Sequence, residues 1–145
     1  MSQNESPSKL DNQLFFAFYA TNLSLNKYYR KLLAPYGLTY PQYLVMLILW
    51  ENDQLTVSEI GKKIFLESST LTPLLKRLET LKLIERKRSL NDERMVLISI
   101  TEKAKDLEKK VASIPEKILA SVKCDPEKAC TLTEDLRVIR ANLSM

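Results

Sequence analysis

The sequence predicts a mostly α-helical protein built as a single domain over residues 1–145. Its 145 residues are 45% hydrophobic and 28% charged, a balance typical of one globular domain with a real core. Only two glycines are present, and leucine, lysine, glutamate and alanine are abundant. This composition favours helices over a sheet protein with many tight turns.

Two features of the composition argue against an enzyme. The chain contains no histidine, so the commonest general base is missing and nucleophile–histidine catalysis is excluded. Cys124 and Cys130 are the only cysteines, too few for a disulfide framework, and a zinc site would depend on these thiols and on carboxylates. We therefore expect no catalytic residue, no metal site and no cofactor.

Net charge and hydropathy bear on the kind of partner and on the cellular compartment. The net charge of +4 and the pI near 9.0 are compatible with a polyanionic partner. No apolar run approaches the roughly 20 residues that span a bilayer, and the polar first residues lack the basic and apolar regions of a signal peptide. The sequence therefore predicts a cytoplasmic protein without a membrane partner.

The first predicted helix runs from residue 11 to residue 33. Its apolar residues recur near helical spacing, and Pro35 and Gly37 end it. The apolar stripe is wider than a surface helix needs, so the helix belongs either to the core or to a subunit interface. The stripe consists of Leu14, Phe18, Leu25, Tyr29 and Leu32.

Two further helices follow with recognisable starts. In "LTYPQYLVMLILWE", Thr39 lies at the cap and Pro41 in the first turn of an almost wholly apolar run, which predicts the central buried helix. In "LTVSEIGKKIF", Thr56 and Glu59 have the spacing of a capping box, which predicts a short helix.

A second short helix, "SSTLTPLLKRLE", begins within a few residues. Glu67, Ser68 and Ser69 supply cap-type side chains, and Pro73 lies early in the helix, where a missing N–H is tolerated best. The pair matches a helix-turn-helix whose second helix enters the major groove, although such pairs also occur in proteins that never bind DNA. Inward residues are Leu71, Leu74, Leu75 and Leu78, and outward residues are Ser69, Thr70, Thr72, Lys76 and Arg77.

Two strand-like runs, 83–86 and 95–100, flank a polar loop and predict a β-hairpin. Basic residues concentrate on it, whereas a solvated hairpin without a partner usually mixes its charges, as Asp92 and Glu93 at the tip partly do here. We expect Asp92 to hold Arg94 in place, and an arginine at a narrow tip suits the minor groove. Helices and hairpin together predict a winged helix-turn-helix lobe over residues 38–101. The basic residues are Arg86, Lys87, Arg88 and Arg94, and the loop contains Ser89, Asn91 and Asp92.

The C-terminal part predicts a helix interrupted at Pro115, then a helix that Asp125 caps with Pro126 at its first position. An apolar stripe precedes this last helix, and packing against the first helix of a second subunit would cover it. Residues 10–37 and 102–145 are therefore expected to form dimerisation helices, although a monomer that buries the stripe internally stays open. The stripe consists of Val111, Ile114, Ile118, Leu119 and Val122.

Several motifs together are similar to one family. The run "DERMVLISIT" after a helix-turn-helix resembles the wing signature of MarR-type bacterial regulators. The runs "LDNQL", "LTYPQYLVMLILWE", "LTPLLKRLE" and "RKR" followed by "DER" resemble the organic-hydroperoxide-sensing repressor branch of that family, called OhrR. The resemblance extends from about residue 10 to residue 101, and its co-occurring motifs are highly specific.

The resemblance implies a homodimeric winged-helix repressor that controls an organic-peroxide or oxidative-stress response. Such a protein binds double-stranded DNA at a pseudo-palindromic operator, with the helix from Ser68 in the major groove and Arg94 in the minor groove. An organic hydroperoxide is then the candidate effector. The candidate DNA-binding residues are Ser68, Ser69, Thr70, Thr72, Lys76, Arg77, Arg86, Arg88, Asp92 and Arg94.

The chain departs from this branch at the peroxide sensor. In the branch a reactive cysteine follows "NQL" and bonds to tyrosines that match Tyr29 and Tyr40, whereas this chain has Phe15 in its place. A phenyl ring has no sulfur that peroxide can oxidise to sulfenic acid, so we expect first-helix sensing to be lost. Without a sulfur partner, the two tyrosines are expected to be core residues with satisfied hydroxyls.

Some members of the branch also carry a resolving cysteine shortly after a motif like "IPEKIL". The matching position here is Ala120, and Cys124 lies one helical turn on. Cys124 and Cys130 define the main alternative function, a redox-active thiol protein, while their plain interpretation is that of small apolar side chains. The remaining alternative is a scaffold or interaction module, which predicts no steep salt dependence of DNA binding.

Overall fold

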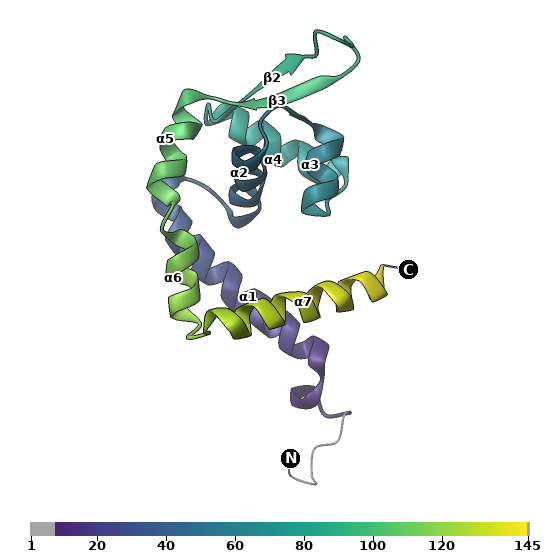
Figure 1. Cartoon of the computed structure of the whole chain (residues 1–145), viewed down its shortest axis with the longest axis vertical. Coiled ribbons are helices and arrows are strands. Elements are labelled where there is room, and N and C mark those ends of the chain that lie inside the picture. Colours follow the sequence, from purple (N-terminus) through teal and green to yellow (C-terminus); the bar gives the residue numbers. More distant parts are fainter. Residues whose placement is uncertain (1–7, 145) are drawn as a thin grey trace. The chain divides into compact units, whose positions relative to one another are not determined.

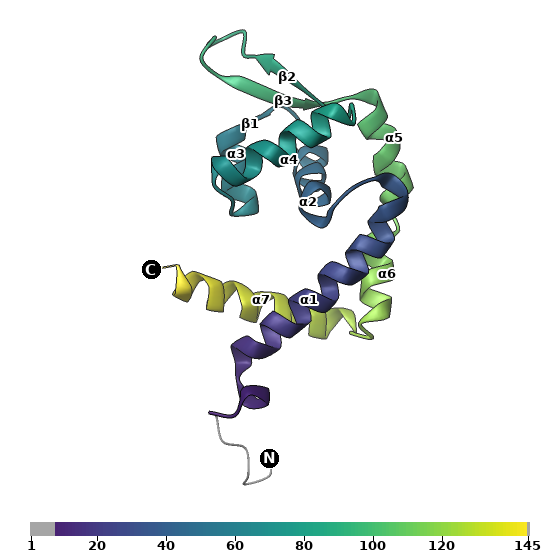
Figure 2. The same ribbon diagram turned by 180° about the vertical axis from the view of Figure 1, so that it is seen from behind.

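The structure, a computed structural model, describes residues 8–144, which form two compact units (Figures 1 and 2). The first unit ends at Glu108 and the second begins at Lys109. The predicted mostly helical fold with one small antiparallel sheet is confirmed. Residues 1–7, where we expect no signal peptide, lie outside the described residues, as does residue 145.

Helix α1 (Leu14–Leu33) begins three residues later than predicted. Gln13 is its N-cap and has an extended backbone, with φ −84° and ψ 124°, so the preceding Leu10–Asn12 forms a separate 3-10 turn. The predicted end is confirmed at Leu33. A second 3-10 turn then reaches Gly37, whose φ of 69° lies in the left-handed region that glycine adopts without a side-chain clash.

Helix α2 (Tyr40–Glu51) is the central buried helix that its apolar sequence predicts. A complete capping box starts it: the Thr39 N–H donates to Gln42 Oε1 at 2.9 Å, and the Gln42 N–H donates to Thr39 Oγ1 at 3.4 Å. This pairing explains why the polar Gln42 side chain is buried. Val45, Met46 and Leu49 have no exposed surface.

The turn between helices α3 (Val57–Ile64) and α4 (Ser68–Thr80) is tight. Phe65 ends α3 in the left-handed region with φ 60°, and the Leu66 N–H donates back to the Gly61 carbonyl at 3.1 Å. A Cβ atom added at Gly61 would lie 2.9 Å from the Leu66 carbonyl oxygen. Glycine at this position therefore lets the chain reverse closely enough for α4 to follow.

Replacing Gly61 by alanine should lower the free energy of unfolding by about 1–3 kcal/mol, because the blocking atom belongs to the backbone and cannot rotate away. The sign of this change in the free energy of unfolding is diagnostic, since replacing glycine by alanine inside an unhindered helix stabilises a protein by roughly 0.5–1 kcal/mol. Urea denaturation followed by circular dichroism measures the difference. Lys63→Ala, two residues further along α3 at an exposed position, is the control and should stay within about ±0.5 kcal/mol of wild type. A more stable Gly61→Ala protein would contradict the tight turn.

Two details of the predicted helix caps require correction. The Thr56 hydroxyl accepts from the Glu59 N–H at 3.1 Å, but no return bond from the Glu59 side chain is found among the described residues. Glu67 is the N-cap of α4 without a side-chain cap bond. Ser68 and Ser69 are then helical residues rather than caps.

The inner face of α4 is largely as predicted. Leu71, Leu75 and Leu78 are fully buried, whereas Leu74, which we expected to face inward, is only half-buried at the edge of the helix face. Pro73 is the sixth residue of α4, beyond the first turn where its missing N–H would cost nothing. It therefore leaves one carbonyl of the first turn without its usual helical donor.

Three antiparallel strands form one small sheet in the order β1-β3-β2. The hairpin strands β2 (Ile84–Arg88) and β3 (Val96–Ile100) each begin one residue later than predicted, and β2 also ends two residues later. The sequence pattern did not reveal β1 (Leu55–Thr56), because two residues are too few to show strand alternation. The buried side chains of the sheet are Ile84, Ile98 and the polar Ser99.

Helix α5 (Glu102–Val111) continues from the sheet across the boundary between the units. At the start of α5, the Thr101 hydroxyl donates to the Lys82 carbonyl at 2.7 Å and accepts from the Ala104 N–H at 3.2 Å. The Trp50 indole N–H donates to the Ala104 carbonyl at 3.0 Å. These bonds attach α5 to the helix-turn-helix part of the first unit.

The second unit contains α6 (Ile114–Ser121) and α7 (Pro126–Leu143). Pro115 lies in the first turn of α6, so the predicted interruption precedes it. The predicted Asp125 cap is confirmed by a 2.7 Å bond from the Lys128 N–H. In the predicted apolar stripe, Leu119 and Val122 are exposed while the other three residues are buried.

Within residues 8–144 no single helix is long and apolar enough to cross a membrane. One pair of helical segments, Leu14–Tyr36 and Tyr40–Glu51, passes the same length and composition test only when taken together, and it is bent by 68°.

Candidate nucleic-acid interface

The outer face of α4 presents hydroxyl groups at its start and basic groups further along. Ser68, Ser69 and Thr70 are exposed in the first turn, where the free N–H groups of a helix favour phosphate. The Thr72 hydroxyl donates to the Ser68 carbonyl at 2.7 Å, which orients it along the helix. Lys76 and Arg77 are exposed. The structure therefore brings all six predicted α4 residues to one accessible helix.

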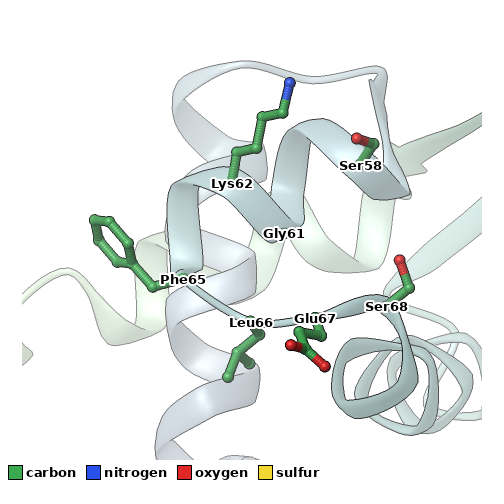
Figure 3. Close-up of a pocket in the computed structure, with 7 residues that line it drawn as sticks. All are labelled: Ser58, Gly61, Lys62, Phe65, Leu66, Glu67 and Ser68. Atoms are coloured by element: carbon green, nitrogen blue, oxygen red, sulfur yellow. The ribbon is translucent and has the colours of Figure 1, made fainter. Parts of the chain in front are cut away.

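An open pocket of ≈540 Å³ lies between α3 and the start of α4 (Figure 3). In Figure 3 the Lys62 amine and the Phe65 ring extend away from the ribbon, while the Ser58 and Ser68 hydroxyls lie near the helix starts. Sequence reasoning did not single out Ser58 or Lys62, although the adjacent lysines in the last turn of α3 were a visible signal. The lining residues are Ser58, Gly61, Lys62, Phe65, Leu66, Glu67 and Ser68.

The tip of the hairpin is held by its own hydrogen bonds. The Ser89 N–H donates to the Met95 carbonyl at 2.8 Å and closes the loop. Asp92 does contact Arg94 as predicted, but through the Arg94 backbone N–H, which donates to Asp92 Oδ1 at 3.0 Å. The ion pairs between described residues do not include the Arg94 guanidinium. Its charge is therefore available at the tip.

The other two arginines of the hairpin are partly engaged. Arg86 Nε lies 2.8 Å from Glu79 Oε2, so this side chain, which is predicted to bind DNA, also connects β2 to α4. Arg88 Nη1 donates to the Glu93 carbonyl at 3.4 Å. The Arg86–Glu79 ion pair is partly exposed and stabilises by about 1 kcal/mol at most. The pair links the hairpin to the C-terminal half of α4.

The three predicted sensor residues do not meet within one chain. Phe15 is 54% exposed, and its ring packs edge-on against Phe18 with centroids 5.5 Å apart. Phe15 and Tyr29 are both in α1, where a separation of 14 residues corresponds to about 21 Å. Tyr29 instead stacks on Tyr40 with centroids 4.0 Å apart. Any site that joins position 15 to these tyrosines would need a second chain.

The surroundings of Tyr29 and Tyr43 favour the neutral phenol in both residues. Burial, followed by the nearby Tyr40, raises the pKa of Tyr29 well above its ordinary value. Burial likewise raises the pKa of Tyr43, whose ring centroid is 6.2 Å from that of Tyr29. Tyr29 and Tyr40, which we expected to be core residues, are each half-buried. A neutral phenol can still donate a hydrogen bond to an acceptor placed beside it.

The two thiols are free and lie on different elements. Cys124 is half-buried in the connection after α6 ends at Ser121, so it does not continue the helix from Ala120 as predicted. Cys130 is exposed on α7. Over the part of the chain that the structure describes, no group of three or more cysteine or carboxylate side chains is arranged to hold a metal ion.

Comparison with known proteins gives consistent matches. Residues 27–111 match the family described as transcriptional regulator SarA/Rot. An organic hydroperoxide resistance transcriptional regulator of Bacillus subtilis strain 168 is 51% identical over 77% of this chain and 76% of its own length. The regulator TtmR of Methylorubrum extorquens strain PA1 is 43% identical over 99% of this chain and 74% of its own length.

A solved structure of a similar protein contains DNA. It is described as reduced AbfR bound to DNA, and AbfR is a protein of Staphylococcus epidermidis. It superposes with a TM-score of 0.78 and 33% sequence identity, covering 94% of this chain and 95% of that one.

Proposed function

This chain belongs to the SarA/Rot family of transcriptional regulators, and from that premise we propose that it is a sequence-specific, homodimeric repressor. It binds double-stranded DNA at a pseudo-palindromic operator and controls an organic-peroxide or oxidative-stress response. The function named for the Bacillus subtilis relative supports the peroxide connection. A repressor acts on the chromosome, which in bacteria places it in the cytoplasm.

The observation that carries the DNA-binding role is that α4 and the basic hairpin belong to one compact unit. The Glu79–Arg86 ion pair holds the two elements together, so both can meet DNA at once. The exposed hydroxyls and N–H groups of α4 suit the edges and phosphates of a major groove, and Arg94 suits the adjacent minor groove. Residues 38–101 are the proposed DNA-binding lobe.

Exposed apolar side chains at both ends of the chain support a second subunit. Large apolar residues on α1 and α7 remain accessible to solvent, which costs free energy unless a partner covers them. A two-fold dimer would also place two α4 helices about one DNA turn, roughly 34–36 Å, apart. The accessible residues are Leu14, Phe15, Tyr19 and Leu23 on α1, and Leu132, Leu136, Val138 and Leu143 on α7.

The proposal is tested by letting the chain select its own operator from a random-sequence pool of duplexes. The selected sites should be inverted repeats with half-sites one helical turn apart, and sedimentation should show a dimer without DNA. Affinity should fall by about 0.9 log units per log unit of salt for each phosphate contacted. A monomer at micromolar concentration, or enrichment of no common sequence, would contradict the proposal.

A further inference from the structure

Leu90 stands out on the surface of the hairpin. Its side chain is 103% exposed, more than any other large apolar residue for which an exposure is given. Single exposed leucines are common on proteins, and exposure alone assigns no role. The position of Leu90, however, is the tip of the basic hairpin rather than an arbitrary surface site.

The loop around Leu90 is ordered by short hydrogen bonds. The Ser89 N–H donates to the Met95 carbonyl, and the Asn91 N–H donates to Ser89 Oγ at 3.2 Å. Leu90 lies between these two anchored residues, so its backbone needs little further ordering when a partner binds. A pre-ordered residue loses less conformational entropy on contact, and more of its contact free energy appears as affinity.

The charges around Leu90 indicate the kind of partner. Arg88 and Arg94 lie on either side of Leu90 along the loop, and the acidic Asp92 and Glu93 lie between Leu90 and Arg94. Asp92 directs one carboxylate oxygen to the Arg94 backbone N–H, which fixes the turn beneath the tip. A DNA minor groove has negative potential along its floor and apolar sugar faces along its walls, so it can receive the Arg94 guanidinium and the Leu90 side chain together.

We propose that Leu90 enters the DNA minor groove beside Arg94 and makes apolar contact with the sugars and base edges there. The inference rests on the proposed function, and it adds a second wing residue that contributes affinity without charge. Proteins that bind the minor groove commonly pair basic side chains with an apolar residue of this kind. The charge of Arg94 and the apolar contact of Leu90 then act on the same stretch of the operator.

The first test measures affinity against salt for Leu90→Ser and Arg94→Ala on the duplex that the wild-type chain selects. Full burial of a leucine side chain changes an equilibrium constant by roughly tenfold or more, so Leu90→Ser should weaken binding about three- to tenfold per wing. Its salt slope should equal that of wild type, because no counterion is released by an uncharged contact. Leu90→Ile should retain most of the affinity.

Two comparisons keep the outcomes distinct. Leu90→Ser should keep the circular dichroism spectrum and the sedimentation of the wild-type chain, so that neither unfolding nor loss of the dimer accounts for weaker binding. If Arg94→Ala weakens binding while Leu90→Ser does not, the inference about Leu90 is wrong and the DNA-binding role stands. If neither change matters, the proposed role of the hairpin fails as well.

A second experiment locates the side chain directly. Leu90→Cys, made with Cys124→Ser and Cys130→Ser, can carry an iron–EDTA group that cleaves nearby DNA sugars. Cuts offset toward the 3′ side on the two strands are expected, because that offset follows from a source in the minor groove. An offset toward the 5′ side, or no cutting, would overturn the proposal.

Discussion

Replacing Arg94 by alanine should weaken operator binding by about 100-fold or more. A hydrogen bond to a charged group contributes roughly 1.5–3 kcal/mol, and a dimer loses one such contact at each of two wings. The Arg94 guanidinium takes part in no ion pair among the described residues, so its removal should leave the fold unchanged. Fluorescence anisotropy with the selected duplex measures the affinity, and circular dichroism checks the fold.

Arg86→Ala is the matched control on the same hairpin. Arg86 already pairs with Glu79, so its loss should shift the hairpin slightly and weaken binding several-fold, much less than the loss of Arg94. Glu79→Ala should have the same small effect, because either change breaks the same contact. An Arg94→Ala protein that binds like wild type would show that the hairpin does not reach DNA.

Local patterns in the sequence predicted the helices and most of the buried face of α4. Thr39 with Pro41 marked the start of α2, and the leucine spacing of α4 identified three fully buried residues correctly. These predictions succeed because capping and helical periodicity depend on residues that are close in sequence. The hairpin was predicted for the same reason, from two apolar runs around a polar loop.

Contacts between elements were beyond the reach of such patterns. Glu79 and Arg86 lie on a helix and a strand, and only the folded chain shows that they pair. Strand β1 is defined by its partner β3 rather than by its own two residues. In contrast, the separation of Phe15 from Tyr29 follows from their places in one helix, so the sequence already excluded contact within a chain.

The second large effect is expected at position 15, where cysteine should create a peroxide response. Phe15 is half exposed in the isolated chain, so a thiol placed there would be accessible to an organic hydroperoxide. A cysteine thiolate attacks the peroxide oxygen, the sulfur is oxidised to sulfenic acid, and the alcohol leaves as alkoxide. Phenylalanine offers no atom for this reaction. Operator binding by the present chain should therefore be insensitive to peroxide.

The experiment compares operator binding with and without organic hydroperoxide for this chain and for Phe15→Cys, both carrying Cys124→Ser and Cys130→Ser. Peroxide should release DNA only from Phe15→Cys, and a thiol reductant should restore binding, because oxidation to sulfenic acid is reversible.

The affinity of each protein for the operator before peroxide is added is informative too. Since the Phe15 ring contacts Phe18 and not the Tyr29–Tyr40 stack of its own chain, any strain from the larger ring must arise between subunits. Overpacking there would cost about 1–3 kcal/mol. A Phe15→Cys dimer that binds DNA tenfold tighter than the parent would show that the ring favours the dissociated geometry of the dimer. One that binds tenfold weaker would show that the ring favours the DNA-binding geometry. Peroxide-dependent release from the parent chain that survives both serine substitutions would show that chemistry at position 15 is not needed for sensing.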